Sequence, residues 1–299
     1  MIIMFNKEIL SAIINEMQNA SESVQIITAY CKENSLKYLA NSISKCVVDK
    51  KLMVRFRLDD LVKGSTDFDI LDYCIQTGWK VYIRFDLHAK TYIVDNKRGF
   101  VGSANATNSG LGIGKAGNIE MGTLVDIEPQ DIIKINALFR DAILVDDLIL
   151  EKLRMQYSLV DASDMPCSKT WNSDITSLFR PRIEALFSYE LPESSDIVKG
   201  MHIGFLDEVF DGDWQSLKEA FRWSNAYIWL LNTLMGNGGV MYFGELSSKL
   251  HNALVTDPKP YRKDVKILLA NLLAIIEQLE MEEIIIDRPN YSQRIQLVK

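Results

Sequence analysis

The sequence has no run of about 18 apolar residues, the length that a membrane-spanning helix requires, although 47% of its 299 residues are hydrophobic. We therefore expect no spanning helix. The first seven residues, Met-Ile-Ile-Met-Phe-Asn-Lys, lack the basic start and the long apolar stretch of a secretory signal. With 24% charged residues, the composition is that of an ordinary globular protein with room for two domains or one large one.

Cysteine and histidine are also scarce. The four cysteines (Cys31, Cys46, Cys74 and Cys167) show no Cys-x-x-Cys spacing, and the chain has three histidines. Such a set argues against a zinc cluster. We expect reduced thiols, mostly in buried segments, and hence a cytoplasmic protein with no metal site.

The chain carries 33 lysines and arginines against 40 acidic residues, a formal net charge of −7. An acidic total argues against a protein that coats nucleic acid nonspecifically. The charge is uneven, because residues 1–155 have a net charge of −1 and the remainder has a net charge of −6. A local basic groove is therefore compatible with the acidic total.

The first half of the sequence alternates between helical and strand-like patterns. Residues 6–19 place apolar side chains at helical spacings of three and four, and residues 24–30 form a β-branched run typical of a buried strand. Further helices are predicted at 34–45, 67–77 and from Pro129 to about 157, and further strands at 52–58, 80–85, 91–95, 99–101 and 120–126. The short turn between 91–95 and 99–101 indicates a hairpin. We therefore expect an α/β fold, with a mixed sheet flanked by helices.

The second half has a different organisation. Prolines and Ser/Asp clusters in residues 158–203 predict a connector, and residues 204–299 predict a smaller, mainly helical domain. Its elements are predicted as a long helix (214–234), a short strand (240–243), a helix (244–254), a longer helix (262–279) and a closing hairpin (283–287 and 294–298). This order resembles a winged helix, a helix-turn-helix variant, which implies DNA binding or dimerisation.

Basic residues gather around the start of the helix predicted at 262–279. They are Lys249, Lys259, Arg262, Lys263 and Lys266. Against Asp257 and Asp264, they give residues 249–266 a local net charge of +3. Basic groups at a helix start suit contacts with nucleic-acid phosphates, although a solvated helix end would give the same pattern.

The strongest pattern lies between residues 88 and 120. It reads His-Ala-Lys-Thr-Tyr-Ile-Val-Asp from His88 to Asp95 and, after six further residues, Gly-Ser-Ala-Asn from Gly102 to Asn105. These offsets resemble the signature of the phospholipase D superfamily, H-x-K-x4-D followed by G-S-x-N. Related nucleases place an acid about 15 residues beyond the asparagine, where this chain has Glu120. The resemblance implies a phospholipase D-like catalytic domain over residues 1–157.

The residue types fit phosphodiester chemistry. His88 and Lys90 are two apart on a predicted strand, so that both side chains project from one face. Imidazole is a nucleophile or proton carrier near neutral pH, and the Lys90 ammonium offers a positive charge to a phosphate oxygen. Asn105, if it lies beside Lys90, adds hydrogen-bond donors to the same anion. Glu120 can accept a proton from the second imidazole nitrogen.

Two other residues of the motif have less direct predicted roles. Asp95 stands at a strand end before a turn, and we expect it to hold backbone amides rather than substrate. Ser103 could bond the phosphate or only its own loop, and the sequence leaves both readings open.

The resemblance implies a two-step reaction that needs neither a metal nor a cofactor. One histidine attacks phosphorus and forms a phosphohistidine, a histidine from a second motif protonates the leaving oxygen, and water then resolves the adduct. The chain has only one motif, because neither His202 nor His251 is followed by a lysine two residues later. The second copy must come from another chain, which predicts an isologous homodimer with the site across its two-fold axis.

Three functions remain open. Single-motif members of the superfamily are mostly small nucleases and restriction-type endonucleases, which implies a DNA endonuclease of a restriction or defence system. A lipid phosphodiesterase is the alternative, although the sequence shows no clear amphipathic membrane helix and we expect no membrane partner. A dimeric DNA-binding protein with an idle site is the third function, and the intact motif argues against it.

Overall fold

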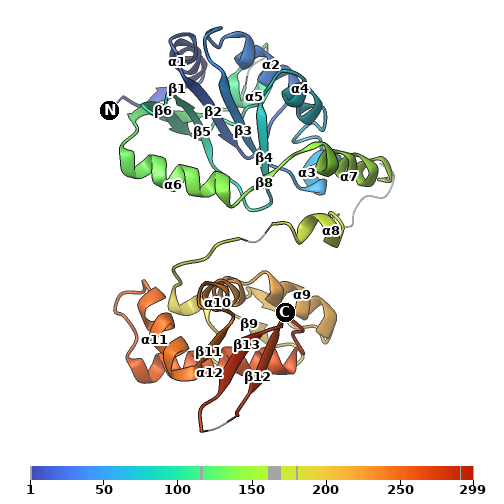
Figure 1. Ribbon diagram of the computed structural model, residues 1–299, viewed down its shortest axis with the longest axis vertical. Helices are drawn as coiled ribbons and strands as arrows, with labels where there is room; N and C mark the ends of the chain where they lie inside the picture. Colours follow the sequence, from blue (N-terminus) through green and yellow to red (C-terminus); the bar gives the residue numbers. More distant parts are fainter. Residues whose placement is uncertain (1, 115–116, 161–169, 180, 290, 299) are drawn as a thin grey trace. The chain divides into compact units, whose positions relative to one another are not determined.

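The computed structural model describes residues 2–114, 117–160, 170–179, 181–289 and 291–298. The chain divides into two compact units, Met1–Arg180 and Pro181–Lys299 (Figure 1). Each unit has its own hydrophobic core. No helix of the described residues is long and apolar enough to cross a membrane.

The segment 158–203, predicted as a separate connector, is divided between the two units. Trp171 and Phe179 are buried in the core of the first unit. Leu186 and Leu191 are buried in the core of the second. Prolines and polar clusters indicate loops, but the apolar residues between them can still pack into a core. The segment was therefore predicted as a connector although its apolar residues belong to the two cores.

The cysteines of the described residues are free thiols. Cys31 and Cys74 are buried, as expected, whereas Cys46 is exposed. Cys167 lies outside the described residues.

An eight-stranded mixed sheet forms the centre of the first unit (Figure 1). Its strands, in spatial order, are β1 (Met4–Phe5), β7 (Met121–Asp126), β6 (Arg98–Gly102), β5 (Lys90–Val94), β2 (Ser23–Thr28), β3 (Asp49–Arg55), β4 (Lys80–Arg84) and β8 (Ile143–Leu144). Strands β2, β3 and β4 are parallel, and all other neighbours are antiparallel. The carboxyl ends of β2, β3, β4 and β6 therefore lie at the same edge as the amino ends of β5 and β7.

Helices flank this sheet, and the predicted fold class is confirmed. They are α1 (Lys7–Gln18), α2 (Glu33–Asn41), α3 (Leu58–Val62), α4 (Ile70–Gln76), α5 (Asn108–Leu111), α6 (Pro129–Arg140), α7 (Asp147–Ser158) and α8 (Ser173–Thr176). The single helix predicted from Pro129 to about 157 is wrong, because β8 separates α6 from α7 and pairs with β4. Ile143 of β8 is buried, so that these apolar residues extend the sheet instead of a helix.

Alternate residues of the central strands serve two cores on opposite faces of the sheet. Ile26 and Val54 belong to the larger core, which also contains buried residues of α1, α2 and α4. Ile27 and Met53 point to the other face, where they pack with Phe139 of α6. The sheet is thus covered on both faces at its centre.

On the face of the sheet that α6 covers, one group of apolar side chains is exposed. Phe5 of β1 pairs with Met121 of β7, and Val101 of β6 pairs with Thr123, two residues beyond Met121. These side chains therefore share one face. Phe5, Val101 and Met121 are 45%, 44% and 51% exposed, and Ile3 beside them is 57% exposed. We call these four residues the apolar sheet face.

The second unit is mainly helical, with two small sheets. Its elements are the 3₁₀ turn Ser188–Glu190, β9 (His202–Ile203), β10 (Glu208–Val209), α9 (Trp214–Arg222), α10 (Asn225–Gly236), β11 (Val240–Tyr242), α11 (Phe243–Ala253), α12 (Arg262–Gln278), β12 (Ile284–Asp287) and β13 (Arg294–Leu297). The last three strands form an antiparallel sheet in the order β11–β13–β12. The succession α10, β11, α11, α12, β12, β13 is the order of a winged helix.

The long helix predicted at 214–234 is two helices in the structure. The first ends at Arg222, and the hydroxyl of Ser224 then caps the second by accepting the backbone NH of Tyr227 at 3.3 Å. A serine at an N-cap favours the start of a new helix. The apolar pattern continues across the break, and for this reason it predicted a single helix.

Candidate active site

The motif residues gather at the sheet edge where the carboxyl ends of β2, β3 and β6 meet the amino ends of β5 and β7. Lys90 is the first residue of β5 and pairs with Thr28, the last residue of β2. His88 lies two residues before β5, not on the strand as predicted, because pairing with β2 begins only at Lys90. The His88 side chain is exposed at this edge.

Two basic side chains lie together here. The Lys90 ammonium donates a hydrogen bond of 2.7 Å to the backbone oxygen of His88. Partial burial lowers the pKa of Lys90, the charge of Arg55 lowers it further, and Glu120 raises it. The pKa of His88 is lowered first by the Lys90 charge, then by desolvation and by Arg55. The imidazole therefore stays neutral, and available as a nucleophile, to a lower pH than a free histidine.

Asn105 lies in the loop after β6, beside the end of β2. Its Oδ1 accepts the backbone NH of Tyr30 at 3.0 Å and lies 3.3 Å from the Thr28 hydroxyl. The same hydroxyl accepts the backbone NH of Ala106 at 3.1 Å. Because the side-chain oxygen is already occupied, the amide NH₂ is the part of Asn105 that can donate to an anion.

Glu120 is buried directly before β7. Its hydrogen-bond partners differ from the predicted one, the His88 imidazole. Its carboxylate accepts hydrogen bonds from the Ser103 hydroxyl and from Nδ2 of Asn118, the latter at 3.2 Å. No hydrogen bond within the described part of the chain joins Glu120 to His88, although the carboxylate raises the pKa of Lys90. A buried carboxylate needs donors, and the adjacent hydroxyl and amide supply them.

The Gly-Ser pair of the motif holds β6 close to β7. The Ser103 hydroxyl accepts the backbone NH of Met121 at 3.0 Å, and the Ser103 NH donates to the Met121 oxygen at 2.9 Å. A Cβ on Gly102 would lie 2.5 Å from that oxygen and 2.9 Å from Cζ of Phe100. Only glycine permits this approach, which brings Ser103 within reach of Glu120.

Asp95 lies at the other end of β5, away from these groups. Its carboxylate accepts the backbone NH groups of Ser21, Glu22 and Ser23 at 2.9, 2.7 and 2.9 Å, and the Ser21 hydroxyl at 2.9 Å. Partial burial raises the pKa of Asp95, but the donors outweigh it and the net pKa is lowered. Asp95 thus anchors the loop before β2 and does not reach the edge that carries His88.

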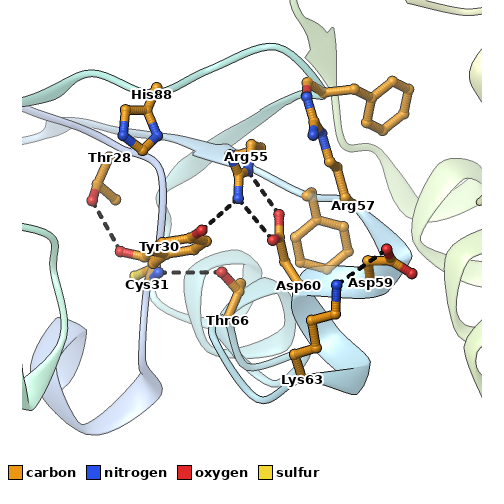
Figure 2. A network of polar contacts seen from close by, with 12 residues as sticks. Thr28, Tyr30, Cys31, Arg55, Arg57, Asp59, Asp60, Lys63, Thr66 and His88 are labelled. Carbon is orange, nitrogen blue, oxygen red and sulfur yellow. Dashed lines mark hydrogen bonds and ion pairs between the residues drawn. The ribbon is translucent and has the colours of Figure 1, made fainter. Parts of the chain in front are cut away.

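Sequence reasoning missed three residues at this edge, Tyr30, Arg55 and Asp60. Figure 2 shows Arg55 between the His88 imidazole and the Asp60 carboxylate. The available signal was that Tyr30 ends the strand predicted at 24–30 and that Arg55 lies within the strand predicted at 52–58. The sequence does not say that these two strands are parallel neighbours, which is what brings Tyr30 and Arg55 together.

The five predicted nucleic-acid contacts lie in the second unit, on and between α11 and α12. Lys249 is on α11, Lys259 is in the loop before α12, and Arg262, Lys263 and Lys266 are in the first turns of α12. All five are exposed.

Comparisons with known proteins bear on the first unit. Residues 13–142 match the family model described as the phospholipase D-like domain of cardiolipin synthase. Nuc from Salmonella typhimurium, a phospholipase D family member, is similar at 15% identity over 49% of this chain and 97% of that chain, with a TM-score of 0.38. NucT from Helicobacter pylori is similar at 15% identity over 48% of this chain and 100% of that chain, with a TM-score of 0.34. Phosphatidylserine synthase from Haemophilus influenzae is similar at 12% identity over 52% and 44%, with a TM-score of 0.38.

No curated protein is significantly similar to the chain. The family match covers strands β2 to β7 of the sheet and the whole segment from His88 to Glu120. The chain therefore carries a domain of the phospholipase D superfamily. Membership of this superfamily supports chemistry of the phosphodiesterase type.

Proposed function

We propose that the chain is a DNA endonuclease that cleaves phosphodiester bonds through a phosphohistidine on His88, without a metal ion. One observation carries the proposal: the His88 imidazole and the Lys90 ammonium, at the start of β5, lie at the same sheet edge as the Asn105 amide, which follows β6. An imidazole beside a fixed cation and an amide donor is what nucleophilic attack on a phosphate diester requires.

The reaction follows from these groups. Lys90 and Asn105 bind the non-bridging phosphate oxygens and withdraw charge from phosphorus. A nitrogen of His88 attacks, the N–P bond forms, and the P–O bond to the leaving group breaks as a second imidazole donates a proton to that oxygen. Water then attacks phosphorus, the second imidazole accepts its proton, and the P–N bond breaks. The two steps together consume one water and restore both imidazoles.

The second imidazole is proposed to be His88 of another copy of the chain. His202 and His251 belong to the second unit, and neither is part of a second motif; His202 lies 3.3 Å from Asp207. The apolar sheet face supports dimerisation, because its exposed side chains offer a surface for a second copy, and Met121 among them directly follows Glu120 in the sequence. Apolar side chains exposed in a group are typical of protein interfaces.

DNA is the proposed substrate because the second unit has the winged-helix order and exposed basic residues at the start of α12. In a winged helix this helix is the one that enters the major groove. In a restriction or defence system, the second unit would recognise the DNA sequence that is to be cleaved. The second candidate is transfer or hydrolysis of a phospholipid phosphodiester, which the description of the matching family as cardiolipin synthase favours. A dimeric DNA-binding protein with an idle site is the non-catalytic candidate.

Plasmid cleavage in EDTA tests the proposal. Purified protein, a His88→Ala variant and a His202→Ala variant are incubated with supercoiled plasmid and, separately, with vesicles that contain a labelled anionic phospholipid. We expect nicked or linear plasmid with the wild type and with His202→Ala, and none with His88→Ala. Turnover of the lipid alone would support the second candidate, and DNA binding without cleavage of either substrate would support the third.

A further inference from the structure

Arg55, the last residue of β3, has an unusually fixed side chain. Its guanidinium donates to both carboxylate oxygens of Asp60 at 2.8 Å, through Nε and Nη2, and to the Tyr30 hydroxyl at 2.6 Å. It also lies 4.7 Å from the centroid of the Tyr30 ring. The side chain is only 13% exposed. A planar guanidinium held by a forked carboxylate and an aromatic face has one orientation.

This fixed cation lies beside two other basic groups. Figure 2 shows the His88 imidazole on the side of Arg55 opposite to Asp60, and the charge of Arg55 acts on both His88 and Lys90. The charged groups that act on the imidazole are Lys90 of β5 and Arg55 of β3. The Asp60 carboxylate holds Arg55, and the Glu120 carboxylate acts on Lys90. Cations that repel one another at a sheet edge form a site prepared for an anion.

Arg55 is also connected to the amide of the motif. Its partner Tyr30 donates its backbone NH to Oδ1 of Asn105 at 3.0 Å. The contacts run from Asp60 through Arg55 and Tyr30 to Asn105, and each consecutive pair is joined by a hydrogen bond. The orientation of Asn105 therefore depends on a residue that does not touch it.

We propose that Arg55 is a positioning residue of this site, which fixes Tyr30 and Asn105 and presents a permanent positive charge beside His88. The inference rests on the proposed phosphodiesterase function and adds a residue that the motif does not contain. Arg55 acts through His88 and Asn105 and need not contact the substrate.

The chain contains a matched control one strand away. Arg84 is the register partner of Arg55 on β4, and it also holds a carboxylate, that of Asp86, through Nε and Nη2 at 2.8 and 2.9 Å. Its side chain is 7% exposed. Arg84 is therefore a strand-end arginine of the same kind, without the contacts to Tyr30.

The test is an NMR titration of the histidine Cε1–H resonances in the full-length protein, which has three histidines. His88→Ala assigns the resonance of His88. We expect Arg55→Gln to raise the pKa of His88, Arg55→Lys to leave it near the wild-type value because the charge is kept, and Arg84→Gln to leave it unchanged. In plasmid cleavage, we expect Arg55→Lys to lose roughly tenfold in rate, because a lysine cannot hold both Asp60 and Tyr30.

An Arg55→Gln protein with an unchanged His88 titration would overturn the inference, and so would an equal shift in Arg84→Gln. If Arg55→Gln does not fold, Tyr30→Phe, which removes only the hydroxyl contact of Arg55, must slow cleavage, and wild-type cleavage by Tyr30→Phe would also overturn it. The titration does not depend on turnover. A wild-type protein that shows the His88 coupling but cleaves no phosphodiester would therefore refute the proposed function and not the position of Arg55.

Discussion

The side-chain oxygens of Thr28 and Asn105, two residues 77 positions apart in the sequence, lie 3.3 Å from each other. The Thr28 hydroxyl also accepts the backbone NH of Ala106. One buried hydroxyl thus ties the loop that follows β6 to the end of β2. The amide of Asn105 is held from two sides, by Thr28 and by the backbone of Tyr30.

Replacement of Thr28 by valine removes this tie and keeps the branched shape. The Ala106 NH then loses its acceptor, which we expect to lower the free energy of unfolding by about 1–3 kcal/mol. We expect the cleavage rate to fall roughly tenfold, because Asn105 is less well oriented. Urea denaturation and single-turnover cleavage measure the two effects, and Thr28→Ser, which keeps the hydroxyl, is the control. A destabilised valine variant that cleaves at the wild-type rate would show that Asn105 does not depend on Thr28.

Replacement of Lys90 by methionine changes the titration of His88 in a known direction. The Lys90 charge is the largest of the causes that lower the pKa of His88, so its removal favours the imidazolium and raises this pKa. We expect the pKa of His88 to rise more than in Arg55→Gln. We also expect the acid limb of the pH profile of residual cleavage to move to higher pH. NMR titration measures the shift, and Lys97→Met, at the far end of the hairpin, is the control. A larger rise in Arg55→Gln than in Lys90→Met would contradict the structure.

The Asp95→Asn variant tests whether Asp95 only anchors the loop before β2 or also takes part in catalysis. The folded pKa of Asp95 is lowered, so the stabilisation is present above the unfolded pKa, about 3.9, and is lost as the pH falls through the folded value. We expect the variant to lose about 1–3 kcal/mol of unfolding free energy at pH 7 and to differ less from the wild type near pH 3. Denaturation curves at both pH values test this, with the exposed Asp69→Asn as control. Cleavage at 25 °C should be little changed, and a complete loss in a folded variant would assign Asp95 a role in the chemistry.

Met121→Asp tests whether the apolar sheet face joins two copies. A carboxylate in an apolar interface is costly to desolvate, so we expect a monomer that is folded but inactive. Light scattering after size exclusion gives the mass, and plasmid cleavage gives the activity. Ile133→Asp, on the exposed side of α6, is the matched control and should remain dimeric and active. A monomeric wild type with full activity would rule out the shared site.

The basic start of α12 is tested by the double variant Lys263→Glu and Lys266→Glu. If both lysines contact phosphates, DNA affinity falls and the slope of log affinity against log salt becomes shallower by about 2. Fluorescence anisotropy with a short duplex at several salt concentrations measures both quantities. Lys199→Glu, also exposed in the second unit, should leave the slope unchanged. An unchanged slope in the double variant would remove α12 from the DNA contacts.

Much of the site could be predicted because its groups are spaced along one stretch of chain. The offsets from His88 to Glu120 match a known signature, and the hairpin between them returns the chain to the same sheet edge. The contact between Ser103 and Glu120 was not predicted, because the spacing of residues does not show which of several donors a buried carboxylate selects. Arg55 and Tyr30 come from strands that the sequence does not pair, and only the parallel register brings them to His88.

The boundaries of the elements show the same limit. The apolar periodicity of 214–234 continues through Trp223, and only the cap at Ser224 ends one helix and begins the next. Between Pro129 and residue 157, the apolar pair Ile143–Leu144 forms the edge strand β8, because β4 has an unpaired side. A local cap thus decides the first boundary, and a contact that is distant in the sequence decides the second.

The position of Asp95 has a consequence for the motif as a whole. Lys90 and Asp95 flank the four remaining residues of β5, one at each edge of the sheet. The number of residues between Lys90 and Asp95 is therefore set by the length of β5. It has no direct link to the reaction. Because successive side chains of a strand alternate between faces, a single inserted residue would turn one end of β5 over relative to the other. The two ends of β5 thus fix the number of residues between Lys90 and Asp95, whereas the packing of the buried Tyr92, Ile93 and Val94 fixes their types.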